Sequence, residues 1–312
     1  MALLSLSDSR LISFYSPDRF ARRVVFQINY VPESRMLTEL QHKILKKVSS
    51  GAPNSCSGSA YVGKSKIATL LGKRFLQTLK GKTIIDFGCG EGLEAVELAR
   101  NGAGRVFGID IRANVLEIAK RHAIDAGVQD ICQFGLSAEE PADIIISLDS
   151  FEHYSDPIGV LHTMSSLLKP HGKVIAAFGP TWYHPFGGHL FSVFPWAHLV
   201  FSEKALIRWR SDFKEDGATK FGEVAGGLNQ ISIRRFESLV AASPLEVGEM
   251  ELVPIRKLKL LHNRITREFT TAVVRCQLIR RHAPMSIMQT TVCPAIDCSD
   301  TQPIRSAVSR AL

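Results

Sequence analysis

The chain has 312 residues, of which 45% are hydrophobic, and its 38 basic and 30 acidic side chains give a net charge of +8. This composition excludes global disorder and suffices for one large domain or two small ones. No apolar stretch reaches the ~18–20 residues of a membrane span, and no two of the six cysteines have CxxC spacing. We therefore expect a cytoplasmic protein with no membrane span and no metal site.

The residues before position 61 are expected to form an extension of the main domain. A helical period covers residues 36–48, and residues 49–63 are rich in Ser, Gly and Pro, which is typical of a linker. We therefore expect a helical or irregular extension over 1–60, a main domain over 61–281 and a disordered tail over 282–312.

From residue 82 onward, apolar runs alternate with helical patterns. Strands are predicted at 82–88, 105–111, 131–135, 142–149 and 172–179, and helices at 91–100, 113–126 and 156–168, the last beginning with Asp156-Pro157. Strands without apolar–polar alternation are buried on both faces, and alternation with helices indicates a parallel sheet. The pattern predicts a doubly wound, Rossmann-like α/β domain.

The alternation stops after residue 180. Residues 181–222 contain all three tryptophans, and we expect them to form a lid over a substrate site at the carboxyl edge of the sheet, a small satellite core, or both. A helix over 230–242, with Asn229 as its N-cap, and strands over 246–253 and 268–279 follow. Residues 251–312 contain ten basic and four acidic side chains. This excess of positive charge suits an anionic substrate, nucleic acid or a membrane surface, or is simply a solvated basic surface.

The stretch TIIDFGCGEG, residues 83–92, places three glycines directly after a buried strand. Such a turn lies at the carboxyl edge of the sheet, where open α/β folds bind ligands. Gly88 and Gly90 allow a tight turn and remove Cβ atoms that would block a ligand, and Gly92 allows close packing of the helix. Asp110, at the end of the next strand, can accept hydrogen bonds from both hydroxyls of a ribose.

The spacing of the glycines favours a sulfonium cofactor over a dinucleotide. A dinucleotide site has G-x-G-x-x-G, but Leu93 stands where the third glycine would be. Asp86, two residues before Gly88, would repel a pyrophosphate and suits a ligand with an ammonium group and a sulfonium. This favours S-adenosylmethionine over NAD.

Four motifs carry a resemblance to a known family. They are IIDFGCGEG (84–92), VFGIDI (106–111), ADIIISLDSFEHYSDP (142–157) and LLKPHGKVIAAFGP (167–180). The chain resembles the class I S-adenosylmethionine-dependent methyltransferases that act on small molecules. The resemblance is close over about 80–180 and continues loosely to about 281. It implies a mostly parallel, seven-stranded sheet.

The resemblance also implies roles for individual residues. Asp86 and the backbone of Gly88, Cys89 and Gly90, with Gly92 completing the turn, would hold the methionine part of the cofactor. Asp110 would hold the ribose, Ile111 would lie against the adenine, and Asp149 would lie near the transferring methyl group.

The segment that follows the third strand departs from the family pattern. Where the family usually has an acid that reads the adenine amino group, this chain has Leu136. Either Ser137 or Glu139 takes over that contact, or backbone and apolar contacts alone hold the adenine.

Histidines near the carboxyl ends of the fourth and fifth strands are the candidate bases. We take His153 and His189 as candidate catalytic residues, although His153 is equally understood as bonding a nearby turn. His184, His189 and His198 have no common metal-ligand spacing. An apolar or aromatic small molecule is the expected acceptor, and the acceptor atom and the oligomeric state stay open.

Three other functions compete with small-molecule methylation. They are a catalytically silent module that binds the cofactor or a partner, an RNA or protein methyltransferase that uses the basic C-terminal face, and an NAD oxidoreductase. Nucleic acid is disfavoured because the sequence contains no recognisable RNA-binding module. Leu93 disfavours NAD.

Overall fold

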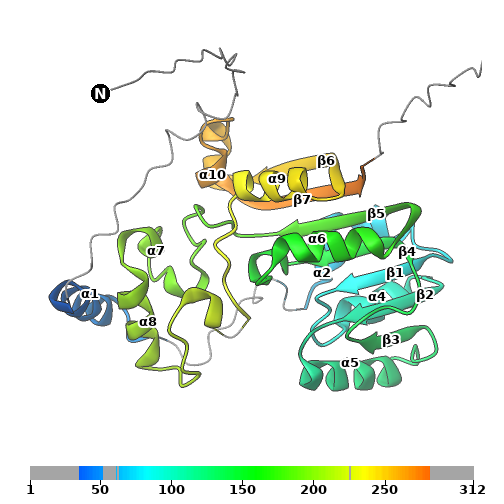
Figure 1. The fold of residues 1–312 in the computed structure, drawn as a ribbon, viewed down its shortest axis with the longest axis horizontal. Coiled ribbons are helices and arrows are strands. Elements are labelled where there is room, and N and C mark those ends of the chain that lie inside the picture. Colours follow the sequence, from blue (N-terminus) through cyan, green and yellow to red (C-terminus); the bar gives the residue numbers. More distant parts are fainter. Residues whose placement is uncertain (1–34, 52–60, 62, 225, 282–312) are drawn as a thin grey trace, which may run out of the picture.

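The computed structural model describes residues 35–51, 61, 63–224 and 226–281. Its centre is one seven-stranded sheet with the order β3-β2-β1-β4-β5-β7-β6, in which only β7 is antiparallel to its neighbours (Figure 1). The strands are β1 (Thr83–Phe87), β2 (Arg105–Ile109), β3 (Cys132–Gly135), β4 (Ala142–Leu148), β5 (Leu168–Phe178), β6 (Leu245–Pro254) and β7 (Thr271–Arg280). The predicted mostly parallel, doubly wound sheet is confirmed.

Helices cover both faces of the sheet because its strands are apolar on both sides. Ile84 packs on one face with α2 (Lys66–Leu71), α4 (Leu93–Arg100) and α5 (Ala113–Asp125). Its neighbour Ile85 packs on the opposite face with α6 (Pro157–Ser166) and α9 (Ile233–Ala242). Both isoleucines are fully buried. Successive side chains of a strand point to opposite faces, so a strand buried on both sides reads as a continuous apolar run.

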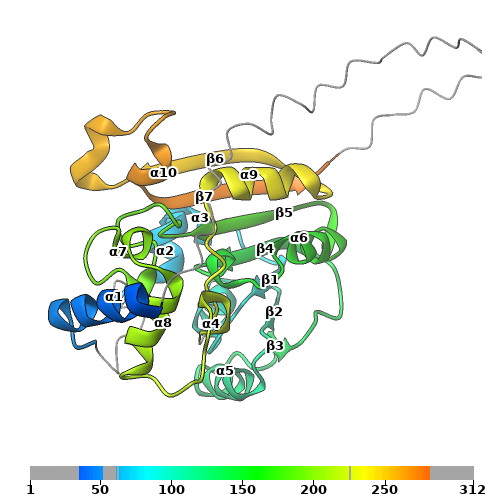
Figure 2. The ribbon, with the colours of Figure 1, turned by 60° about the vertical axis from the view of Figure 1, so that its left-hand side comes forward.

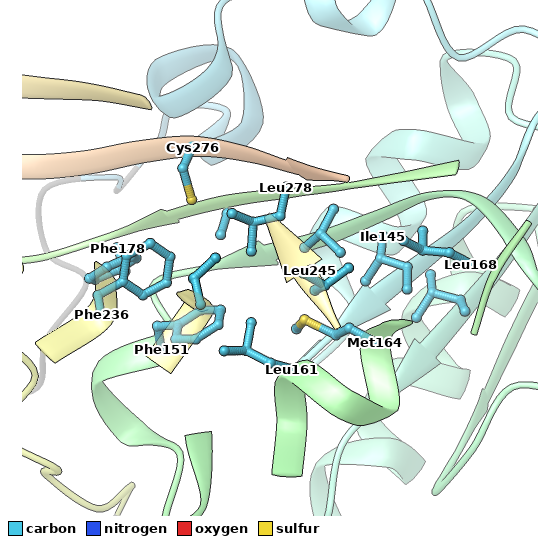
Figure 3. Packing of buried hydrophobic residues seen from close by; sticks show 14 of the residues in the cluster. Ile145, Phe151, Leu161, Met164, Leu168, Phe178, Phe236, Leu245, Cys276 and Leu278 are labelled. Carbon is cyan, nitrogen blue, oxygen red and sulfur yellow. The ribbon is translucent and has the colours of Figure 1, made fainter. Parts of the chain in front are cut away.

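Three phenylalanines join the end of the sheet to its helices (Figure 3). The ring of Phe151 lies 5.4 Å from that of Phe178 and 5.2 Å from that of Phe236, and the last two are 4.9 Å apart. Phe151 opens the short 3-10 helix η4 (Phe151–His153), which directly follows the carboxyl end of β4. Aromatic packing therefore fixes the position of η4 at that edge.

The starts of two helices test the predicted caps. The Asp156 carboxylate accepts a hydrogen bond from the Gly159 amide at 3.0 Å, which confirms it as the cap of α6. The predicted cap of α9 was wrong: Ser232 accepts from the Arg235 amide at 3.1 Å. Asn229 instead donates to the carbonyls of Phe151 and Tyr154, so its side chain ties the chain before α9 to η4.

Residues 181–222 form an ordered unit beside the sheet. It contains η5 (His189–Phe191), α7 (Ala197–Val200), α8 (Glu203–Ser211) and η6 (Phe221–Glu223). Phe191 and Trp209 pack there with Leu45 of α1 (Arg35–Val48), and the Trp209 indole donates to the Ser49 carbonyl at 2.8 Å. The satellite core is therefore present and includes the helix predicted at 36–48. A lid motion of this unit stays a prediction.

Two short elements complete the fold. α3 (Lys73–Leu76) follows α2, and the connection from β6 to β7 contains η7 (Arg256–Leu261) and α10 (Arg267–Thr270). The predicted strand at 268–279 therefore starts later, at Thr271. The predicted tail and most of the predicted extension, 282–312 and 1–34, lie outside the described residues. Among the helices described, none has the length and apolar character that crossing a membrane requires.

Candidate functional site

The glycine turn joins β1 to α4 at the carboxyl edge of the sheet. The amides of Gly88 and Cys89 donate to the Ile109 carbonyl of β2 at 2.8 and 3.0 Å, which holds the turn against the neighbouring strand. Gly88, Gly90 and Gly92 have φ angles of +85°, +51° and +75°. Side chains rarely tolerate this region of backbone space, which explains the three glycines.

The three glycines serve different purposes. A Cβ on Gly88 would lie 2.7 Å from the Ser150 hydroxyl oxygen, and one on Gly92 would lie 2.7 Å from the Ala119 Cβ. At Gly90 the nearest atom would be 3.7 Å away, on Arg112. Gly88 and Gly92 therefore permit close packing within the protein, whereas Gly90 leaves the turn open to a ligand. The side chain of Cys89 is buried, so only its backbone faces that opening.

Asp110 lies beside this opening and is already hydrogen-bonded. Its carboxylate accepts from the Gly90 amide at 3.0 Å, from the Arg112 amide at 2.9 Å, and from Arg112 Nε and Nη2 at 3.0 and 2.9 Å. Burial opposes ionisation of Asp110, but the bonds from Arg112 outweigh it and lower the pKa of this carboxyl. A ribose would have to displace the Arg112 side chain, which is about half exposed.

Asp86 carries an orphaned buried oxygen. The residue is 3% exposed, and its Oδ2 has no hydrogen-bond partner among the described residues. Burial, and then the charge of Glu94, raises the pKa of Asp86 well above its ordinary value. Unsatisfied buried oxygens are costly, so this atom is a place where a ligand's hydrogen-bond donor would be stabilised.

Lys66 and Tyr61, which the sequence analysis did not single out, face the same acids. Lys66 Nζ lies 3.4 Å from Glu94 Oε1 and 4.0 Å from Asp149 Oδ2. A hydrogen bond joins Tyr61 to Asp149, whose pKa is raised to about 6 by burial despite Lys66 and Tyr61. The ammonium group of Lys66 is complementary to the carboxylate of an amino-acid zwitterion, and the carboxylates around it are complementary to the ammonium group of that zwitterion. No motif marks these two residues: Tyr61 lies at the end of the stretch interpreted as a linker, and Lys66 lies just beyond it, at the start of α2.

The ends of β2 and β3 carry two exposed apolar side chains. The Asp110 amide donates to the Gly135 carbonyl at 3.3 Å, so the residues that follow both strands emerge side by side. Ile111 is 90% exposed and Leu136 is 72% exposed. This pair supports the alternative in which apolar contacts hold the adenine, and the contact itself stays a prediction.

His153 is held in one orientation at the end of η4. Its Nδ1 lies 2.8 Å from the Gly227 carbonyl, and because a carbonyl only accepts, Nδ1 carries the proton. Burial lowers the pKa of His153. The ring is therefore neutral at neutral pH, and in this tautomer Nε2 carries the lone pair that can accept a proton.

The structure brings His189 to His153, although they are 36 positions apart in the sequence. The two ring centroids are 5.4 Å apart, and the ring planes are inclined to each other by 64°. His189 Nε2 is buried with no hydrogen-bond partner among the described residues, and burial lowers the pKa of this ring to about 4. His189 and Asp149 also have positive φ angles, +51° and +50°, a cost of about 1–3 kcal/mol each that is typical of functional sites.

Glu152, between Phe151 and His153, is a further buried acid. It is 2% exposed, and its Oε2 has no hydrogen-bond partner in the described part of the chain. Burial, and then the nearby charge of Asp149, raises its pKa to about 8. The acid is therefore mostly protonated at neutral pH. The sequence signal was an acid four residues after an apolar strand.

The other two histidines of the 181–222 unit have structural partners. His198 bonds the Ser192 hydroxyl at 2.9 Å and the Trp182 carbonyl at 2.6 Å, and His184 Nδ1 accepts from the Phe186 amide at 3.0 Å. Within the described residues, no cluster of three or more His, Cys, Asp or Glu side chains has the arrangement of a metal site.

The topology and the open turn together place the chain among the doubly wound proteins that bind a ligand where the strand order reverses. A family model described as a methyltransferase domain matches residues 62–222, just over half of the 312 residues. The chain belongs to this methyltransferase-domain family. The resemblance to class I S-adenosylmethionine-dependent methyltransferases is thereby confirmed.

Curated relatives match a shorter segment. The chain is 37% identical over 102 residues to the ubiquinone biosynthesis O-methyltransferase of Ralstonia nicotianae, and 39% identical over 102 residues to that of Klebsiella pneumoniae. Each match covers 31% of this chain and 42% of the relative. The chain thus spans less than half the length of these curated relatives.

Solved structures with related folds are more distant in sequence. The magnesium protoporphyrin IX methyltransferase of Synechocystis PCC 6803, with bound SAH, has a TM-score of 0.46 and 15% identity over 78% of this chain and 96% of its own. An S-adenosylmethionine-dependent methyltransferase of Mesorhizobium loti has a TM-score of 0.45 and 16% identity over 67% of this chain and 95% of its own.

Proposed function

We propose that this protein transfers a methyl group from S-adenosylmethionine to a hydroxyl group of a small, apolar or aromatic molecule. The observation that carries the proposal is the charge arrangement beside the open turn. The buried, unpartnered oxygen of Asp86 and the carboxylate of Asp149 suit an ammonium group, and Lys66 among them suits a carboxylate. The methionine part of the cofactor carries both groups.

The remaining cofactor contacts follow from the ends of the strands. The open backbone at Gly90 leaves room for the methionine part of the cofactor. Asp110 accepts hydrogen bonds from the ribose hydroxyls, which replace those from the Arg112 side chain. Ile111 and Leu136 offer apolar surface to the adenine. When bound, S-adenosylmethionine supplies a methyl group activated by its positive sulfur.

The protein's part in the reaction is alignment and proton removal. Holding two reactants in line is worth about 7–11 kcal/mol of the barrier. His153, with its proton fixed on Nδ1 by the Gly227 carbonyl, takes the acceptor's hydroxyl proton on Nε2. His189 is a positioning residue, because its ring packs against that of His153.

Two observations support a hydroxyl group on an apolar or aromatic molecule as the acceptor: the side chains around these histidines and the names of the curated relatives. Residues 181–222 supply aromatic side chains at this edge of the sheet, including Tyr183 and Phe186, which are partly exposed. The curated relatives that match 102 residues of this chain are named ubiquinone biosynthesis O-methyltransferases. Both support a hydroxyl acceptor on an apolar or aromatic body. We propose that the 181–222 unit closes over it and excludes water.

A second candidate is a catalytically silent module, and one observation favours it. Arg112 and Gly90 already saturate the Asp110 carboxylate, as they would in a protein that no longer binds the cofactor's ribose.

Two measurements separate the candidates. Isothermal titration with S-adenosylmethionine and S-adenosylhomocysteine tests the cofactor site, and labelled methyl transfer to a panel of phenols and catechols tests the reaction. We expect binding of both compounds and transfer that His153→Ala slows by about 10²–10⁴-fold. Binding without transfer to any acceptor favours a silent module that still holds the cofactor. Absence of binding contradicts both the cofactor site and the reaction, and is the outcome that the saturated Asp110 carboxylate favours.

A further inference from the structure

The connection from β6 to β7, residues 255–270, exposes large aliphatic side chains to solvent. Leu260 is 100% exposed, Ile265 89% and Leu261 60%. These three residues are close together in one short excursion that η7 and α10 frame. Single exposed leucines need no explanation, but a cluster of them in one projecting segment is typical of an interaction site.

Hydrogen bonds hold this connection in a defined shape. The Ile255 amide donates to the Thr270 carbonyl at 2.8 Å, which closes its base, and His262 Nδ1 bonds the Thr270 hydroxyl at 2.8 Å. At the tip, the Asn263 side chain accepts from the Ile265 and Thr266 amides at 2.8 and 3.1 Å. The aliphatic side chains are therefore presented outward by an ordered turn.

Positive charge surrounds the exposed tip. Arg256, Lys257, Lys259 and Arg264 are exposed, and none of them forms an ion pair with a residue that the structure describes. The connection's one acid is turned inward: Glu268 accepts from the amides of Ile233 and Arg234 at the start of α9. The tip thus combines aliphatic side chains with uncompensated cations.

The connection lies beside the proposed acceptor site. β6 runs parallel to β5, so the residues after β6 leave the sheet at the same carboxyl edge as the glycine turn. Figure 2 shows the connection projecting past the strand ends on the side where α7 lies. The ring of Phe269 is 5.5 Å from that of Tyr183, in the 181–222 unit.

We propose that residues 255–270 dock the protein on a membrane surface that carries anionic lipids. Leu260, Leu261 and Ile265 insert at the boundary between headgroups and acyl chains, while the four cations contact the headgroups. A second copy of this chain fits less well, because the same cations would face one another. Nucleic acid fits less well because aliphatic tips offer it neither stacking nor hydrogen bonds. The inference goes beyond methyl transfer and does not require turnover.

Vesicle co-sedimentation tests the proposal with the full chain. We expect at least about tenfold stronger binding to vesicles of phosphatidylcholine mixed with phosphatidylglycerol than to phosphatidylcholine alone, and weaker binding at high salt. The double variant Leu260→Asp/Ile265→Asp should lose about tenfold or more of this affinity. The double variant Lys257→Glu/Lys259→Glu should lose a similar amount, on anionic vesicles only.

The control is Ile124→Asp, which charges another exposed aliphatic side chain, on α5 at the other end of the sheet and 61% exposed. It should bind vesicles as the wild type does, and all variants should keep the wild-type melting temperature and cofactor affinity. Absence of vesicle binding, or binding that neither double variant weakens, would overturn the proposal. So would a dimer, seen by sedimentation velocity without lipid, that Leu260→Asp/Ile265→Asp dissociates.

Discussion

The two halves of the candidate site are assembled in different ways. The cofactor half consists of the glycine turn, Asp86 and Asp110, which lie at the ends of the adjacent strands β1 and β2. The acceptor half consists of His153, His189 and the 181–222 unit, which come from separate parts of the chain. The cofactor half is local, because pairing of neighbouring strands brings its residues together. The acceptor half depends on how the 181–222 insertion packs on the sheet. We therefore expect substitutions to separate cofactor binding from turnover.

The largest expected effect is on turnover when the candidate base is removed. His153→Ala should lower kcat by about 10²–10⁴-fold, the usual contribution of a general base, because Nε2 no longer accepts the acceptor's proton. Affinity for S-adenosylmethionine should stay at the wild-type value. His162→Ala, at an exposed position of α6, is the matched control. Equal kcat for the two variants would place the base elsewhere.

The next prediction concerns Glu152 and the pH dependence of the free energy of unfolding. Burial raises its pKa from 4.5 to about 8, so the folded protein holds a proton that the unfolded chain releases between these pH values. The contribution of this proton to the free energy of unfolding is therefore fully present below pH 4.5. It falls as the pH rises from 4.5 and is lost once the pH has passed through 8. Glu152→Gln should remove this loss, which is ~5 kcal/mol at most, whereas Glu249→Gln at an exposed position of β6 should not. Denaturant unfolding at several pH values measures the free energy of unfolding of both variants. The same pH dependence in the wild type and in Glu152→Gln would contradict the burial argument.

Lys66 tests whether the cofactor half extends beyond the predicted motifs. Lys66→Met should weaken S-adenosylmethionine binding by about tenfold, because a partly buried partner of the ligand's carboxylate is lost. Lys64→Met, nearby but exposed, should bind as the wild type does. Titration calorimetry of the two variants decides the point, and identical affinities would remove Lys66 from the site.

The smallest expected effect is a displacement of the acidic limb of the pH profile. Burial lowers the pKa of His153 below 6.5, so its neutral, proton-accepting form persists to lower pH than in a free histidine. Activity should fall only as the pH drops through this lowered value. An acidic limb centred above pH 6.5 in kcat would indicate another titrating group.

The fold could be predicted, and the residues of the proposed cofactor half could be singled out, because their determinants are local. A β-branched strand, three glycines and an acid after the next strand appear within residues 83–111, and strand alternation alone indicated the sheet. The contact of Lys66 and Tyr61 with Asp149 could not be predicted, because α2 and the residues before it reach the site only through their packing on the sheet. The same holds for His153 and His189: each was singled out, but their contact depends on η5.

The N-cap of α9 shows a further limit. Asn229 and Ser232 are both good capping residues, and sequence cannot rank them. The structure uses Ser232 for the helix, since Asn229 is engaged with the carbonyls of η4.

The most direct test of the account is the affinity of Asp110→Ala for S-adenosylmethionine, measured by titration calorimetry beside the wild type. Removing a carboxylate that accepts from a ribose should weaken binding by about 10–100-fold, with the sheet still folded by circular dichroism. Because Arg112 also loses its partner, Arg112→Ala serves as the control and should bind at least as well as the wild type. Unchanged affinity in Asp110→Ala would contradict the central claim that this strand end grips the cofactor.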